Sequence, residues 1–188
     1  MIAIKEKDAV YFASPMKFHN FLNQARVDFA FEENGNVWHV GDEGRIVMAS
    51  TDNWRLLDVM RYSDTFDSEL SEEGMNGAVA KLKKAIKGTN CFMNGDNLGA
   101  TFFVAQGNKG YKVSAFGAIF EIDDIECTGE RDEPVLAAYE YCKDIPDVYK
   151  RIEELYNRIS DFSDLQYFPI AVVSTKDNSY TLITKDKS

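Results

Sequence analysis

Few residues in this sequence have the chemistry for catalysis, and they form no recognised motif. Ser14 is a hydroxyl whose nearest candidate bases are His19 and His39. The members of a Ser-His-Asp triad converge only in space, so the sequence neither assigns nor excludes one. The chain has only two histidines in 188 residues. We interpret His39 as a strand residue that packs near Trp38 rather than as a catalytic base.

The cysteines and the acidic residues do not indicate a metal or redox site. The three cysteines have no CxxC spacing, so we expect reduced thiols rather than disulfides or zinc ligands. An acidic run contains Asp123, Asp124, Glu126 and Glu130 but lacks the glycine and glutamate positions of an EF-hand loop. We interpret this run as a solvated loop, and we expect neither a metal ion nor a cofactor.

Composition narrows the class of partner. The chain has 31 acidic and 21 basic residues, a net charge of -10, and 45% hydrophobic residues. An acidic surface repels phosphate backbones and anionic lipid, so we expect no nucleic-acid or membrane partner. No apolar run approaches the ~20 residues that span a bilayer, and the first eight residues lack an apolar signal core. We therefore expect a cytoplasmic protein.

The first half of the chain predicts strands and then two helices. Apolar residues on both sides of Lys7-Asp8 predict a hairpin, and alternation predicts strands at 27–31, 37–40 and 45–49. A helix capped by Thr51 or Asp52 carries Leu56 to Met60. A second helix is capped by Ser71 and ends at Gly88.

The second half repeats the order of strands, two helices and strands. Strands are predicted at 100–105, 110–116 and 118–122, and the apolar first of these is expected at the centre of a sheet. Helices are predicted from Pro134 through Cys142 and from Pro146 onward, followed by strands at 170–174 and 180–184. Strand runs that alternate with helix pairs predict an α+β layered sandwich.

Three segments resemble the proteasome β-type and HslV peptidase branch of the N-terminal-nucleophile (Ntn) hydrolases. Residues 10–14 (VYFAS) resemble that family's second strand, which ends in two small residues before a catalytic aspartate. Residues 104–121 resemble its sheet hairpin and the Ser-Gly segment after it, and residues 125–140 resemble its Gly-Ser-Gly turn and Ala-rich helix. The resemblance implies a four-layer αββα sandwich, with residues 1–188 forming a single domain.

The resemblance also implies which positions should carry the chemistry. Peptidases of this family attack with the hydroxyl of an N-terminal threonine, whose own α-amine is the base and is tuned by an acid and a lysine. Met1 stands at the start of the corresponding strand, and its removal would expose Ile2, which has no nucleophilic atom. The position of the acid falls at Pro15, and the position of the lysine falls at or near His39. Ser14 is expected at the mouth of the cleft.

Two supporting positions have counterparts in this chain. Thr128 with Gly129 corresponds to the Ser-Gly pair that assists the amine, and Asp161 corresponds to an aspartate after the fourth helix. The resemblance thus implies a vestigial cleft without a competent nucleophile, formed by Met1, Ser14, Pro15, His39, Thr128 and Asp161.

We therefore expect an inactive proteasome-like protein with a structural or interaction role, as a homo-oligomer or part of a larger assembly. Tyrosines on the later helix pair are candidate interface residues, or they cap the sheet with their hydroxyls in water: Tyr139, Tyr141, Tyr149 and Tyr156. Two alternatives stay open. One is an amide or peptide hydrolase with an unrecognised nucleophile, and the other is a small-molecule or peptide binder that reuses the cleft.

Overall fold

The fold was determined as a computed structural model of the 188-residue chain. It describes residues 1–15, 17–19, 26–28, 36–41, 44–51, 53–89, 97–128, 132–161 and 167–184, of which 17–19, 26–28, 54 and 132 are described by backbone alone.

One five-stranded antiparallel sheet, called sheet I here, contains both ends of the described chain. Its order is β10-β1-β2-β11-β12. The strands are β1 (Ile2–Lys5), β2 (Val10–Pro15), β10 (Ile125–Cys127), β11 (Ile170–Ser174) and β12 (Tyr180–Ile183). Sheet I is therefore built from three separate parts of the sequence, with β1 in its interior.

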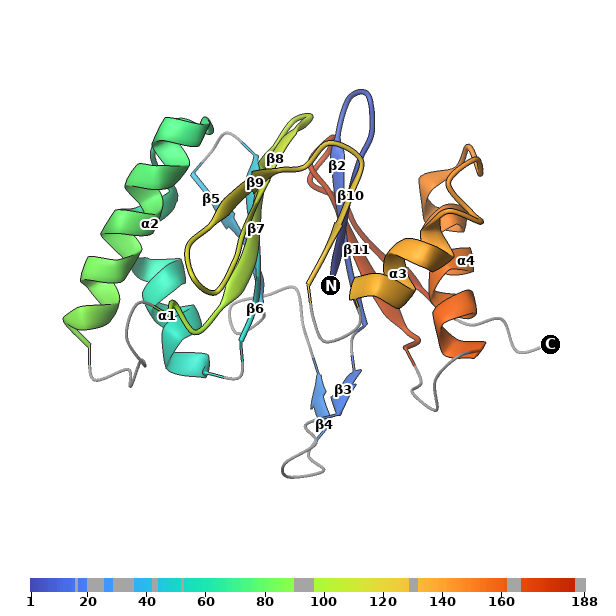
Figure 1. The fold of residues 1–188 in the computed structure, drawn as a ribbon, viewed down its shortest axis with the longest axis horizontal. Coiled ribbons are helices and arrows are strands. Elements are labelled where there is room, and N and C mark those ends of the chain that lie inside the picture. The colour runs from blue at the N-terminus through green and yellow to red at the C-terminus, as the bar shows by residue number, and fades with distance from the viewer. Residues whose placement is uncertain are drawn as a thin grey trace.

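The second five-stranded sheet, sheet II, is a meander in the order β5-β6-β7-β8-β9. Its strands are β5 (Val37–Val40), β6 (Arg45–Ser50), β7 (Thr101–Gln106), β8 (Lys109–Val113) and β9 (Ile119–Glu121). As expected from its apolar sequence, β7 lies at the centre. A separate hairpin of β3 (Lys17–His19) and β4 (Arg26–Asp28) projects from one end of the sandwich (Figure 1).

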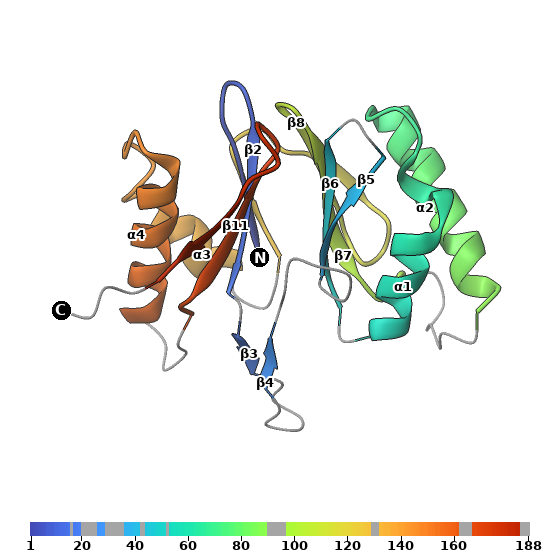
Figure 2. The ribbon, with the colours of Figure 1, turned by 180° about the vertical axis from the view of Figure 1, so that it is seen from behind.

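Helices cover the outer face of each sheet, which gives four layers. α1 (Trp54–Tyr62), the 3-10 turn η1 (Asp64–Phe66) and α2 (Glu72–Lys87) lie on sheet II, while α3 (Asp132–Tyr139) and α4 (Val148–Asp161) lie on sheet I (Figure 1). The view from behind shows the same order of helices, sheet, sheet and helices (Figure 2). The predicted αββα sandwich is confirmed.

Three apolar clusters hold the layers together. One lies between α1, α2 and sheet II, the second lies between α3, α4 and sheet I, and the third lies between the two sheets. In the third cluster the rings of Phe12 from β2 and Phe103 from β7 stack with centroids 5.8 Å apart. Strand alternation explains the arrangement, because successive side chains of β2 and β7 point to opposite faces of their sheets.

The helix boundaries follow the capping rules, with small differences from the sequence predictions. Ser71 caps α2 as predicted, because its hydroxyl accepts from the Gly74 amide at 3.1 Å. The cap of α1 is Asn53, which accepts from the Leu56 amide, so the predicted cap at Thr51 or Asp52 is wrong. α3 ends at Tyr139, short of the predicted Cys142.

The strand predictions are confirmed for the first hairpin, the meander and the last hairpin, with small shifts of their ends. β8 ends at Val113, earlier than predicted. β10 was not predicted at all, because its three residues carry no alternation signal. Of the strand predicted at 27–31, residues 29–31 lie outside the described residues.

Candidate functional site

The first residue of the chain is held in the backbone ladder of sheet I. The α-amino group of Met1 donates to the Thr128 carbonyl at 3.1 Å, and the Thr128 amide donates to the Met1 carbonyl at 3.0 Å. These bonds extend the pairing of β1 with β10, in which Ile2 lies opposite Cys127. In both views the N-terminus lies at sheet I, on its side toward sheet II (Figures 1 and 2).

The side chain that reaches Met1 from sheet II belongs to Asn36. Its carboxamide Nδ2 lies 3.4 Å from the Met1 sulfur and donates to the Ala49 carbonyl at 3.2 Å. The Asn36 carbonyl accepts from the Ala49 amide at 2.8 Å, which fixes this residue beside β6. Asn36 is only 2% exposed, so its amide needs these partners. Asn36 thus joins the two sheets at the start of the chain.

Ser14 lies beside Met1 but is not accessible. The β1–β2 register pairs Ile2 with Ala13, so continuing it by one residue places Met1 opposite Ser14. Ser14 is 4% exposed, and its hydroxyl donates to the Pro15 carbonyl at 3.3 Å. Pro15 is buried in β2 opposite Ile170 and has no ionisable group. This part of the site therefore offers a buried hydroxyl and no acid.

Two of the expected cleft residues do not join this group. His39 is exposed on β5, three residues beyond Asn36, which corresponds to about 10 Å along a strand. The side chain that lies near Met1 at this point in the chain is that of Asn36. Asp161 is exposed at the last residue of α4, in the outer helix layer.

The structure brings Met1, Ser14, Pro15 and Thr128 together, and it adds Asn36. Sequence reasoning missed Asn36 because its contacts are with residues 13 and 35 positions away. The one local signal for Asn36 was its place directly before a buried strand, because a buried amide there needs a hydrogen-bond partner. The side chains of Met1, Ser14 and Asn36 can pack and hydrogen-bond, and none of them titrates near neutral pH.

The predicted interface tyrosines separate into buried and exposed ones. Tyr139 and Tyr156 are buried, so the expectation of exposed rings or hydroxyls in water is wrong for them. The Tyr139 hydroxyl donates to Asp124 at 2.8 Å, and the Tyr156 hydroxyl donates to the Ala13 carbonyl at 3.4 Å. Burial raises the pKa of both phenols well above the usual value, and for Tyr139 the bond to Asp124 adds to the effect. Both residues belong to the apolar cluster between the helices and sheet I.

Tyr141 and Tyr149 are less covered. Tyr149 is half-buried, with its ring edge-on to Tyr11 at 5.8 Å. Tyr141 is 77% exposed, and its ring lies 5.4 Å from the guanidinium of Arg158. Such a cation-π contact holds an exposed ring in place.

The acidic run and the cysteines have structural partners. Asp124 accepts from Tyr139, and Glu126 forms an ion pair with Lys112 at 3.0 Å. Cys127 and Cys142 are both buried, and burial raises the pKa of the Cys142 thiol. Within the described ranges, no group of three or more His, Cys, Asp or Glu side chains is arranged to hold a metal ion. Cys91 and Glu130 lie outside those ranges.

A search for helices that could cross a bilayer, made over the part of the chain that the structure describes, finds none of sufficient length and apolar character.

Comparison with known proteins finds similarity in structure but not in sequence. No protein-family model matches the chain, and no curated protein matches it. Among solved structures, it is similar to Thiobacillus denitrificans BPH in complex with epoxomicin, with a TM-score of 0.73 and 14% identity over 92% of this chain and 96% of that one. It is also similar to Anbu (ancestral beta-subunit) from Yersinia bercovieri, with a TM-score of 0.68 and 11% identity over 98% and 87%.

A further similar structure is eukaryotic HslV from Trypanosoma brucei, with a TM-score of 0.65 and 12% identity over 92% of this chain and 97% of that one. At such identities the likeness is one of fold. It extends over nearly the whole of each chain.

Proposed function

This chain has the proteasome-like Ntn-hydrolase fold, and we propose that within this fold it is a catalytically inactive protein with a structural or protein-interaction role. In this proposal residues 1–188 form a single domain that works in the cytoplasm as a homo-oligomer. Its partners are proteins, not nucleic acids or membranes.

The observation that carries the proposal is the chemistry around Met1. N-terminal-nucleophile catalysis needs a hydroxyl or thiol on the residue that bears the α-amine, together with groups that tune the amine. Met1, which precedes β1, carries a thioether in contact with Asn36, and its nitrogen donates to the Thr128 carbonyl. The neighbouring Ser14 hydroxyl is buried against Pro15. These contacts favour a structural role for the start of β1 over a role as a nucleophile.

Two observations support a protein partner. Leu136 and Tyr141 are exposed at the α3 side of the molecule, 42% and 77% respectively, and Arg158 holds the Tyr141 ring. Exposed aromatic rings that are already ordered cost little entropy when they are buried in an interface. In addition, Anbu, a protein of similar fold, is described as an ancestral beta-subunit, and a subunit is one chain of an assembly. We take a second copy of this chain as the partner.

The cytoplasmic assignment is supported by the thiols and the charge. Cys142 is a buried free thiol, as expected in a reducing compartment. The net charge of -10 favours solubility.

The inactivity is tested with peptide-amide substrates and with epoxomicin, the ligand of the Thiobacillus denitrificans BPH complex. We expect no turnover, no mass adduct and no thermal shift with the purified full chain. BPH is the positive control for the binding of epoxomicin. Turnover that epoxomicin blocks, or a stoichiometric adduct, would refute inactivity.

The interaction role is tested by light scattering coupled to gel filtration. We expect an oligomer that Tyr141→Ser shifts toward the monomer. Tyr62→Ser is the matched control, because Tyr62 is 74% exposed at the end of α1 on the opposite outer layer. A monomeric wild-type chain at all concentrations, or an equal effect of both variants, contradicts self-association through the α3 side.

A further inference from the structure

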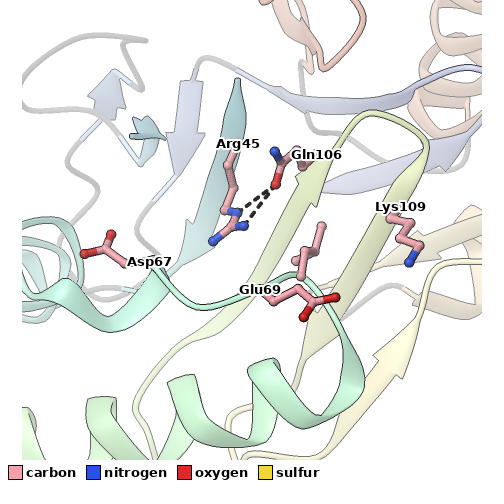
Figure 3. A pocket seen from close by; sticks show the side chains of 6 residues that line it. Arg45, Asp67, Glu69, Gln106 and Lys109 are labelled. Atoms are coloured by element: carbon pink, nitrogen blue, oxygen red, sulfur yellow. Dashed lines mark hydrogen bonds between the residues drawn. The ribbon is translucent and has the colours of Figure 1, made fainter. Parts of the chain in front are cut away.

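A cavity of about 440 Å³ lies at one end of sheet II (Figure 3). It is lined by Arg45 at the start of β6, Gln106 at the end of β7, Lys109 at the start of β8, and residues of the segment before α2, including Asp67 and Glu69. Its size is within the range of small-molecule sites. Ala49, which contacts Asn36, lies four residues from Arg45 on β6, or about 13 Å along the strand.

The topology explains why charged residues line this cavity. On each strand, the residue two positions from the cavity belongs to the apolar cluster under α1 and α2. These residues are Val47 on β6, Val104 on β7 and Tyr111 on β8. Because side chains repeat with a period of two, Arg45, Gln106 and Lys109 lie on that same helix-facing side. The cavity is thus the polar continuation of the core beneath the start of α2.

Arg45 is a buried cation whose position is fixed. It is only 8% exposed. Its Nη1 donates to the carbonyls of Phe66 and Ser68, and its Nε and Nη2 donate to Gln106 Oε1 at 3.2 and 2.9 Å. These bonds use four of the five N–H donors of a guanidinium, so one Nη2 donor remains.

Arg45 has no carboxylate partner among the described residues, since none of the ion pairs there includes it. Among the described residues, the groups that accept hydrogen bonds from Arg45 are neutral carbonyls. A buried charge without a counterion is unfavourable, and an anion that enters the cavity would relieve this. Lys109 lines the same cavity, is exposed and is likewise outside the described ion pairs, so it supplies a second cation.

The acidic residues restrict which anion fits. In Figure 3 the carboxylate of Glu69 extends toward the side of Lys109, whereas that of Asp67 is directed away from Arg45. Neither Glu69 nor Asp67 forms an ion pair with a described residue. An ammonium group on the ligand would match Glu69, while a multiply charged phosphate would be repelled by it.

We propose that this cavity binds a small zwitterion, namely a free amino acid or short peptide, with its carboxylate on Arg45 and Lys109 and its ammonium on Glu69. The proposal does not depend on the absence of catalysis at Met1. It adds a ligand site at the opposite end of β6.

The test is isothermal titration of the full chain with four probes: L-leucyl-L-leucine, its C-terminal amide, its N-acetyl form, and inorganic phosphate. We expect the free dipeptide to bind about tenfold more tightly than either blocked form, because each blocked form loses one charged contact. Absence of a binding signal for L-leucyl-L-leucine at concentrations up to about 10 mM would overturn the proposal. Phosphate that binds as tightly as the dipeptide would also overturn it.

Variants of the two exposed rim residues locate the site without disturbing the Arg45 bonds. Lys109→Gln is expected to weaken dipeptide binding about three- to tenfold. Glu69→Gln is expected to reduce the preference for the free dipeptide over its N-acetyl form to about threefold or less. Lys150→Gln, at an exposed lysine of α4 in the other outer layer, is the matched control and should bind normally. Unchanged binding in both rim variants, or equal losses in Lys150→Gln, would contradict the assignment.

Discussion

The stack of Phe12 on Phe103 is the contact through which the sandwich is best tested by mutation. The two rings belong to different sheets, are fully buried, and lie 5.8 Å apart with an interplanar angle of 22°. Replacing either ring with leucine keeps the site apolar but loses part of its volume. We expect each single change to lower the free energy of unfolding by about 1–2 kcal/mol, less than the 3–5 of truncation to alanine.

The informative quantity is the coupling between the two changes. An aromatic pair contributes about 0.5–1.5 kcal/mol beyond the area that it buries, so the double variant should be less destabilised than the sum of the singles by that amount. Urea denaturation of the four proteins measures this, provided that the slope of unfolding free energy against urea is unchanged.

Phe102 supplies the control, because it is equally buried but belongs to the cluster under α1 and α2 on the other face of β7. Phe12→Leu and Phe102→Leu should therefore be additive within about 0.5 kcal/mol. Equal coupling energies for Phe12 with Phe102 and for Phe12 with Phe103, or no coupling in either pair, would refute the face-to-face packing of sheets I and II.

Three further predictions follow from single contacts. Asn36→Ala should cost about 1–3 kcal/mol in urea denaturation, because the Ala49 carbonyl loses its buried donor; a neutral effect would mean that the bond from Asn36 to Ala49 contributes nothing. Gly110→Ala should cost about 1–3 kcal/mol, because a Cβ there would lie 2.9 Å from Ile122 Cδ1, and Ile122→Val should rescue it by removing that atom; failure of the rescue contradicts the clash. Tyr156→Phe should be less stable than wild type at pH 7 by about 0.5–1.5 kcal/mol in thermal or urea unfolding. Burial raises the folded-state pKa of Tyr156, so above pH ~10 only the unfolded phenol ionises and the wild type loses stability. The difference in unfolding free energy between wild type and Tyr156→Phe should therefore become smaller above that pH. A difference that becomes larger would contradict the prediction.

The order of the elements could be predicted from the sequence because most of the signals are local. The Ser71 cap, the amphipathic stripe of α4 and the apolar run of β7 each depend on residues close in the chain. β10 was missed because a three-residue strand has too few positions to show alternation, and only pairing with β1 defines it. The α1 cap was misplaced because neighbouring residues that can cap compete, and the backbone path decides between them.

The candidate site was only partly predictable for the same reason. Met1, Ser14 and Pro15 could be grouped because they belong to one hairpin. Asn36 could not, because its contact with Met1 depends on how sheet II packs against sheet I. The cavity at Arg45 was not predicted at all, since Arg45, Glu69 and Gln106 are far apart in the sequence and meet only in the folded chain.

The most direct test of the central claim, that this proteasome-like fold lacks N-terminal-nucleophile chemistry, is the intact mass of the purified chain combined with N-terminal sequencing. We predict a single species that begins at Met1 or Ile2 and hydrolyses no peptide amide. A shortened species that begins at serine, threonine or cysteine, and that hydrolyses amides, would contradict the claim.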